Sequence, residues 1–155
     1  GHTSIRPENG RLCPCGRKGC LEAYCSATGV ARTAVELLQQ TDTPSLLRSY
    51  PVAELTSRDV YTAACQGDEL ANEVFRFTGE LLGESLANFA TFSDPEAFIL
   101  FGGLSKAGDF LMKPLKEAYD RNVFENYRDT AQILVSGLKD ADAAILGAAA
   151  LAWLD

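Results

Sequence analysis

Four cysteines fall within thirteen consecutive residues near the start of the chain, and this cluster constrains the fold more than any other feature. They are Cys13, Cys15, Cys20 and Cys25, while the fifth cysteine, Cys65, is remote. An odd count, with no signal-peptide hydrophobic region before it, disfavours a disulfide framework and favours thiolates held by a metal. Glycines and prolines interrupt the first nineteen residues too often for a long helix or strand, so this segment has little core of its own.

A histidine completes the donor set that the cysteines begin. One imidazole and three thiols form the set of a closed tetrahedral zinc site, here His2, Cys13, Cys15 and Cys20. Gly16 and Gly19 stand where the backbone must turn tightly around such an ion. Metal binding of this kind contributes on the order of 10 kcal/mol to folding. The alternative is a flexible loop of reduced thiols. Cys25, on the segment that follows, is expected to be a small core residue and not a fifth ligand.

The composition and net charge limit the kinds of partner that the chain can bind. Its 155 residues suffice for one domain, and 46% apolar with 23% charged residues is globular. A net charge of −7 disfavours binding to nucleic acid or to anionic membrane surfaces by this segment. No apolar run approaches the ~20 residues of a membrane span. We therefore expect a soluble, cytoplasmic protein.

The sequence between the zinc donors and about residue 92 predicts helices. Their expected ranges are 21–25, 26–40, 56–66 and 68–92, with a proline-containing linker at 41–51. Ser26 and Asp68 are suitable N-caps, and Thr56 with Asp59 predicts a capping box. In the long helix, Gly79 and Gly83 permit close approach of a neighbour. Its expected buried stripe is Leu70, Val74, Phe77, Leu81 and Phe89.

The last third predicts a parallel β-α-β unit. The runs 97–101 and 133–136 are short and apolar, as in buried strands, and a helix is expected between them at about 110–122. Asp142 is expected to cap a final helix through Leu154. Two or three strands are too few for the sheet that so many apolar helices need, so the chain reads as part of a larger α/β domain.

Several motifs resemble the signature of the ROK family (repressors, open reading frames and sugar kinases). They are G-H at 1–2, C-P-C-G-R-K-G-C-L-E at 13–22, A-Y-C-S at 23–26, G-D-E-L-A at 67–71, F-I-L-F-G-G-L-S at 98–105 and G-A-A-A-L-A at 147–152. The resemblance implies an actin-like, ribonuclease H-like two-lobed ATPase. The chain, 1–155, would form part of its C-terminal lobe, with a zinc and sugar loop at 1–25 and a helical and β-α-β part at 26–155.

The same resemblance implies ligand-binding roles. His2 corresponds to a histidine that faces both the zinc site and the sugar hydroxyls, although its spacing to Cys13 is one residue longer than usual. Glu22 corresponds to a glutamate that accepts a hydrogen bond from the sugar. Gly102 and Gly103 resemble the loop that contacts the nucleotide. Without the resemblance, Glu22 would be a first-turn glutamate favoured by the helix dipole, and the glycine pair a tight turn.

The implied activity is that of the glucokinase branch, an ATP-dependent hexose 6-phosphotransferase. The phosphate loop, the carboxylate base and the Mg²⁺ site of such an enzyme have no counterpart here, so no catalytic residue is assigned and the isolated chain is expected to be inactive. A ROK-type repressor with its DNA-binding part elsewhere is the alternative, and a non-catalytic zinc-stapled interaction module is a third. A homodimer is expected, because the family is commonly dimeric through this lobe.

Overall fold

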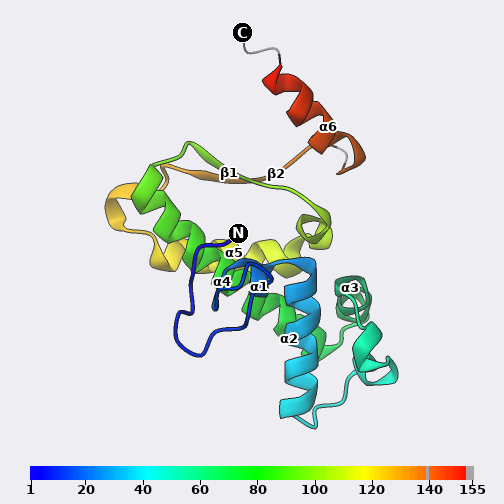
Figure 1. The fold of residues 1–155 in the computed structure, drawn as a ribbon. Coiled ribbons are helices and arrows are strands. Elements are labelled where there is room, and N and C mark those ends of the chain that lie inside the picture. Colours follow the sequence, from blue (N-terminus) through cyan, green and yellow to red (C-terminus); the bar gives the residue numbers. More distant parts are fainter. Residues whose placement is uncertain (139, 153–155) are drawn as a thin grey trace.

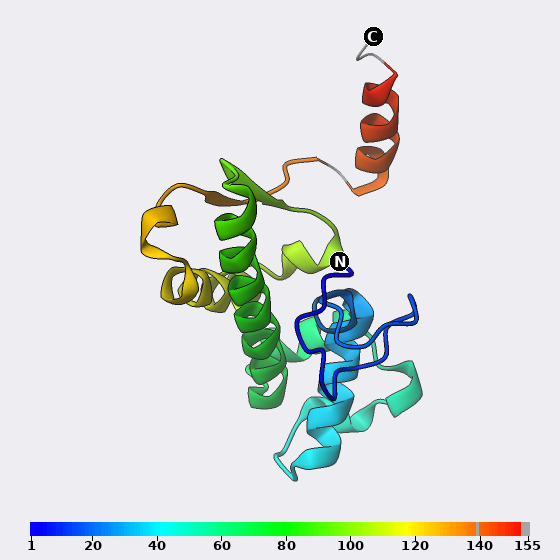
Figure 2. The same ribbon diagram turned by 60° about the vertical axis from the view of Figure 1, so that its left-hand side comes forward.

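The computed structural model describes residues 1–138 and 140–152, which form a helix-rich α/β arrangement. Four helices come first: α1 (Glu22–Cys25), α2 (Ala27–Gln40), α3 (Ser57–Cys65) and α4 (Glu69–Ser93). The second part contains β1 (Ala97–Leu100), α5 (Asp109–Asn122), β2 (Gln132–Val135) and α6 (Asp140–Leu151). In both views α2 and α3 lie at the opposite end from α6, and α4 runs from their end toward the strands (Figure 1 and Figure 2). No helix of the described residues is long and apolar enough to cross a bilayer.

The predicted N-caps begin three of these helices. The Ser26 hydroxyl accepts the Gly29 amide of α2. Thr56 and Asp59 exchange side-chain and backbone hydrogen bonds in the predicted capping box of α3. At α4, Asp68 Oδ1 accepts the Ala71 amide at 2.9 Å. Local side-chain chemistry thus sets where these helices start.

The predicted linker is more ordered than its sequence indicated. It contains the 3-10 helix Leu46–Ser49, and a second one, Val52–Glu54, follows directly. The second carboxylate oxygen of Asp68 accepts the amide of Leu46 at 2.6 Å, which ties the linker to the start of α4. Leu47 is consequently buried in the core.

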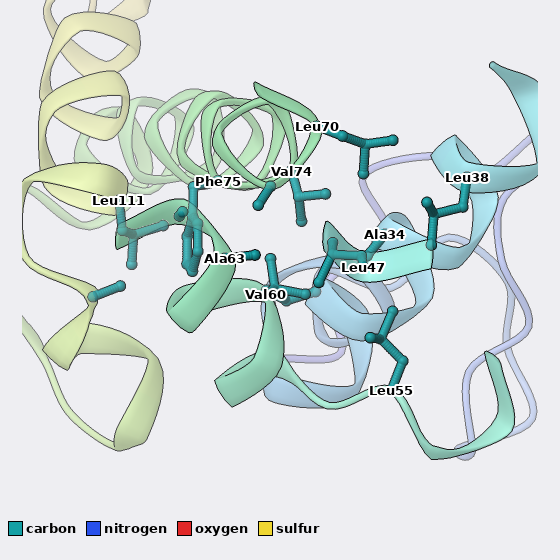
Figure 3. Packing of buried hydrophobic residues seen from close by; sticks show 14 residues of the cluster. Ala34, Leu38, Leu47, Leu55, Val60, Ala63, Leu70, Val74, Phe75 and Leu111 are labelled. Atoms are coloured by element: carbon teal, nitrogen blue, oxygen red, sulfur yellow. The ribbon is translucent and has the colours of Figure 1, made fainter. Parts of the chain in front are cut away.

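One core lies between α2, α3 and the first half of α4 (Figure 3). Leu70, Val74 and Leu81 are buried as predicted, but Phe77 and Phe89 are only half-buried. Phe75, outside the expected stripe, is instead among the largest buried side chains. The reason is that α4 is covered by α2 and α3 on one side and by α5 on another, so its buried face is wider than a single stripe.

The two predicted glycines of α4 are where α5 approaches closely. A Cβ on Gly83 would lie 2.3 Å from the Leu115 carbonyl oxygen and 2.8 Å from Cβ of Ala118. A Cβ on Gly79 would lie 2.7 Å from Cγ of Pro114. A second core, which includes Leu86, Leu115 and Tyr119, follows along the same helix pair.

The strands pair in parallel as predicted, from Ala97 opposite Gln132 to Leu100 opposite Val135. The expectation that they are buried was wrong: Ile99 is 65% exposed, and Leu134 and Val135 are also exposed. Phe98 and Ile133 pack against the α4–α5 core, but the described residues provide no layer on the opposite face of the sheet.

Several predicted boundaries also shift by a few residues. Helix α5 begins at Asp109 and strand β2 at Gln132, each one residue early. Helix α6 begins at Asp140, so Asp142 lies within its first turn and is not its cap. The predicted end of this helix, Leu154, lies outside the described residues. Both views show α6 projecting away from the rest of the chain (Figure 1 and Figure 2).

Candidate metal and ligand site

The N-terminal loop folds back on itself so that distant cysteines meet. Leu12 pairs with Lys18 in an isolated antiparallel bridge, and the Gly16 amide donates to the Cys13 carbonyl at 2.9 Å to close the turn between them. Gly16 has a φ of 85° and Gly19 a φ of 72°, a region that favours glycine. A Cβ on Gly19 would also lie 1.8 Å from the Arg6 carbonyl oxygen, so no other residue fits there.

This loop brings the four predicted zinc donors together. The ligand atoms of His2, Cys13, Cys15 and Cys20 all lie within 4.8 Å of one another. Sγ of Cys13 is 3.6 Å from Nδ1 of His2, and Sγ of Cys15 is 3.6 Å from Sγ of Cys20. With Zn–S bonds of about 2.3 Å, the edge of a tetrahedron is about 3.8 Å. The donor set and its spacing therefore fit a structural zinc ion.

The charges around the cluster suit a bound cation. A hydrogen bond from the Arg17 backbone amide lowers the pKa of the Cys15 thiol to about 6, which favours a thiolate at neutral pH. Burial raises the pKa of Cys20 to about 11, because the charged form loses its hydration. A divalent ion would reverse that penalty by pairing with the thiolate. Arg17 also donates a 2.6 Å hydrogen bond to the His2 carbonyl and so fixes the backbone of this donor.

Cys25 lies outside the group of four donors. It is half-buried, and its Sγ lies 3.7 Å from the Thr78 carbonyl oxygen on α4. Burial raises the pKa of this thiol to about 12, so it is a neutral thiol at physiological pH.

A cavity of about 590 Å³ joins two of the predicted ligand sites. Glu22, Gly102 and Gly103 all line it, although the first starts α1 and the others follow β1. Gly102 has a φ of 100°, and a Cβ on either glycine would meet no atom within 4 Å. The backbone of this loop is thus open to a ligand, as a phosphate or nucleoside contact requires. Ser105 holds the turn, since its hydroxyl donates to the Gly102 carbonyl at 2.7 Å.

The metal loop, defined here as residues 1–20 with their four metal donors, positions Glu22 at the cavity wall. Its amide donates to the Gly1 carbonyl at 2.8 Å, and its carboxylate lies next to Gly1, whose Cβ position would be 2.8 Å from Glu22 Oε2. Glu22 is therefore next to the residue that precedes His2. His2 itself belongs to the metal cluster and is not among the residues that line the cavity.

The cavity also has walls that the sequence did not indicate. Arg58 and Tyr61 line it from α3, one helical turn apart, and Lys106 lines it from the 3-10 helix Gly103–Ala107 that follows β1. In the sequence these are ordinary surface residues of a helix and a loop. The packing of α3 beside α4 places Arg58 and Tyr61 in the same cavity wall as Glu22, and no local sequence pattern predicts that packing.

Comparison with known proteins agrees with this architecture. The model of the ROK family matches residues 1–154. The chain belongs to the ROK family. Its fold is accordingly that of the ROK sugar kinases, which is actin-like.

Individual ROK proteins include both kinases and regulators. The chain is 37% identical to the glucokinase of Halalkalibacterium halodurans, over 95% of this chain and 44% of that protein. It superposes with a TM-score of 0.83 on a ROK family glucokinase from Streptomyces griseus, crystallised in complex with glucose and AMPPNP. That match has 33% identity and covers 97% of this chain and 49% of the other. The chain is also 26% identical to the transcriptional dual regulator NagC of Escherichia coli, over 97% of its own length and 36% of NagC. It spans about half the length of its kinase relatives or less.

Proposed function

We propose that this chain is part of an ATP-dependent hexose 6-phosphotransferase with glucose as its substrate. The observation that carries the proposal is the shared cavity, which Glu22 lines together with Gly102 and Gly103. A kinase needs its two substrates in one chamber, because phosphoryl transfer depends on positioning the acceptor hydroxyl against the phosphate. The glucokinase relatives at 32–37% identity support glucose as the hexose.

Each group of this chain has a defined task in the proposal. The Glu22 carboxylate accepts hydrogen bonds from sugar hydroxyls, and a carboxylate is well suited to paired donors. His2 does not line the cavity in this structure, and its part in sugar binding is proposed from its place in the family motif alone. The backbone at Gly102 and Gly103 approaches the nucleotide without interference from a Cβ. Zinc, when bound, is structural: it holds the loop whose last donor, Cys20, lies two residues before Glu22. Mg²⁺ and the catalytic base are assigned to the longer polypeptide, and the isolated chain is inactive.

A ROK repressor is the second candidate. The 26% identity to NagC favours it, as does a TM-score of 0.73 to a ROK transcriptional regulator at 28% identity. The net charge of −7 means that DNA contacts of such a protein would lie outside this chain. Upstream sequence separates the two candidates, since a phosphate loop favours the kinase and a basic helix-turn-helix the repressor. Under either candidate we propose a cytoplasmic homodimer.

The deciding experiment uses the full-length protein that carries this chain. ATP-dependent phosphorylation of glucose is measured for the unmodified protein, for Glu22→Gln, and for Glu8→Gln as a control on an exposed position of the same loop. We expect the Glu22 variant to raise the KM for glucose by at least tenfold, because it loses a charge-assisted hydrogen bond worth about 1.5–3 kcal/mol. The KM for ATP and the control variant should be unchanged. No phosphorylation by the unmodified protein, with sugar-dependent DNA binding, would replace the kinase with the repressor.

A further inference from the structure

Arg11 is a buried arginine between the metal loop and the first two helices. It is only 7% exposed, and all three nitrogens of its guanidinium group are hydrogen-bonded. Nε and one terminal nitrogen bind the carboxylate of Glu36, the latter at 2.6 Å. The same terminal nitrogen donates to the Thr33 hydroxyl at 2.8 Å, and the other donates to the Ala23 and Gly29 carbonyls at 3.0 and 3.2 Å.

The partners of this side chain belong to both helices that leave the metal loop. Ala23 is in α1, whereas Gly29, Thr33 and Glu36 are in α2. The guanidinium carbon also lies 4.4 Å from the ring centroid of Tyr24, in a cation–π arrangement with α1. One planar group therefore contacts both helices.

The backbone of Arg11 makes a second set of connections. Its amide donates to the Tyr24 hydroxyl at 2.9 Å, and its carbonyl accepts the Gly19 amide at 2.9 Å. Gly19 directly precedes the zinc donor Cys20, and Arg11 precedes the donor Cys13 by two residues. The same residue thus pairs the two segments that carry metal donors and holds both of them to α1.

Burying an arginine at this position costs free energy, because its charge loses hydration. An apolar side chain of similar volume would stabilise a buried site as well or better, whereas a planar fork with fixed donor directions specifies orientation. Glu22 is the first residue of α1, next to the Ala23 carbonyl that Arg11 binds. Any rotation of α1 that moved the Glu22 carboxylate would have to break this hydrogen bond and the stacking on Tyr24.

We propose that Arg11, paired with Glu36, is a positioning residue that couples the order of the metal loop to the placement of Glu22 at the cavity. The link between the metal loop and α1 stands on the contacts alone. The consequence for the sugar rests on the proposed function.

The test is amide hydrogen exchange on the zinc-loaded 155-residue chain. The Ala23, Tyr24 and Cys25 amides report on α1, because they lie in this helix and donate to the carbonyls of Cys20 and Leu21, the two residues directly before it. In Arg11→Met we expect their exchange to accelerate at least tenfold, while that of α4 and α5 is unchanged. Zinc should still bind one to one, but about tenfold more weakly, as for other residues that orient metal ligands. Arg32→Met is the matched control, since Arg32 binds the same Glu36 carboxylate at 3.1 Å from a half-exposed position.

Two results would overturn the proposal. One is acceleration that spreads equally to α4 and α5, which would indicate general destabilisation. The other is an exchange pattern in Arg11→Met no different from that of Arg32→Met. If Arg11→Met does not fold, Glu36→Gln decides, because it keeps the shape and one acceptor: faster exchange confined to residues 11–25 supports the proposal, and no change refutes it.

The sugar consequence is read separately in the full-length protein. Arg11→Met should raise the KM for glucose and leave the KM for ATP unchanged. If Glu22→Gln leaves the KM for glucose unchanged, the proposed sugar role fails, while the exchange result still decides the link between the loop and α1.

Discussion

Sγ of Cys15 lies 3.6 Å from Sγ of Cys20, and both thiols are free. A disulfide requires about 2.05 Å between the sulfur atoms, whereas two thiolates on one zinc ion stand about 3.8 Å apart. The pair is therefore spaced to share a metal.

Zinc content is the first prediction that follows. The purified chain should carry one zinc ion per subunit by native mass spectrometry, and Cys20→Ser should carry none, because three remaining donors leave the site open. Zinc of this kind contributes on the order of 10 kcal/mol, so its loss should disorder the first twenty residues. Cys65→Ser is the control, since this exposed thiol lies outside the cluster. A zinc-free protein in reducing buffer whose first twenty residues stay as protected from amide exchange as those of the zinc-loaded chain would contradict the structural role.

The contact between α4 and α5 gives a second prediction. Gly83→Ala places a Cβ 2.3 Å from the Leu115 carbonyl oxygen, and because that atom is backbone the helices must separate. Overpacking of this kind costs about 1–3 kcal/mol, which exceeds the gain of ~0.5–1 kcal/mol from replacing glycine in a helix. We expect a net loss of about 1–2 kcal/mol in urea unfolding. Gly147→Ala in α6 meets no atom within 4 Å, so it should show only the gain of ~0.5–1 kcal/mol. Equal stability of the two variants would show that the helices are not in close contact.

The sequence was most informative where the structure depends on neighbouring residues. The capping box of Thr56 and Asp59, the cap at Asp68 and the close approach at Gly83 were all predicted, because each has a local chemical cause. The donor set of the metal cluster could also be proposed, since donor type and spacing carry the information.

Features that depend on distant segments were missed or mistaken. The exposure of Ile99 could not be predicted, because an apolar strand has the same sequence whether or not a second layer covers it. Leu47 was assigned to a linker but is buried. The amide of its neighbour Leu46 donates a hydrogen bond to Asp68, which lies twenty-two positions further along the chain. The sequence did not predict the burial or the role of Arg11, because its partners lie on two helices whose mutual angle depends on tertiary packing.

The capping box should make stability depend on pH. Hydrogen bonds from the Thr56 hydroxyl and amide lower the pKa of Asp59 below its usual value of 3.8. A carboxyl whose pKa is lower in the folded state stabilises it above the unfolded pKa, and this contribution is lost as the pH falls through the folded pKa. Asp59→Asn should thus be less stable than the unmodified chain at pH 7, and the difference should shrink below about pH 4. Asp42→Asn, at an exposed loop position, controls for the lost charge. A stability difference that is constant with pH would exclude this mechanism.

Two buried tyrosines should respond in opposite directions to loss of their hydroxyl groups. Among the described residues the Tyr119 hydroxyl has no hydrogen-bond partner, and burial raises its pKa. The Tyr24 hydroxyl, in contrast, accepts the Arg11 amide at 2.9 Å. Tyr119→Phe therefore removes a desolvated group and leaves the ring in place against Phe98, so it should be neutral or stabilise the chain by up to ~1 kcal/mol.

Tyr24→Phe, in contrast, leaves a buried amide unpaired, and it should destabilise the chain by about 1–3 kcal/mol. Because both changes remove one oxygen from a buried tyrosine, each variant is the control for the other in urea unfolding. A loss of similar size in both would mean that the Tyr119 hydroxyl is satisfied in solution. A loss in neither would mean that the Arg11 amide does not depend on Tyr24, and the hold of the metal loop on α1 would then rest on the Arg11 side chain alone.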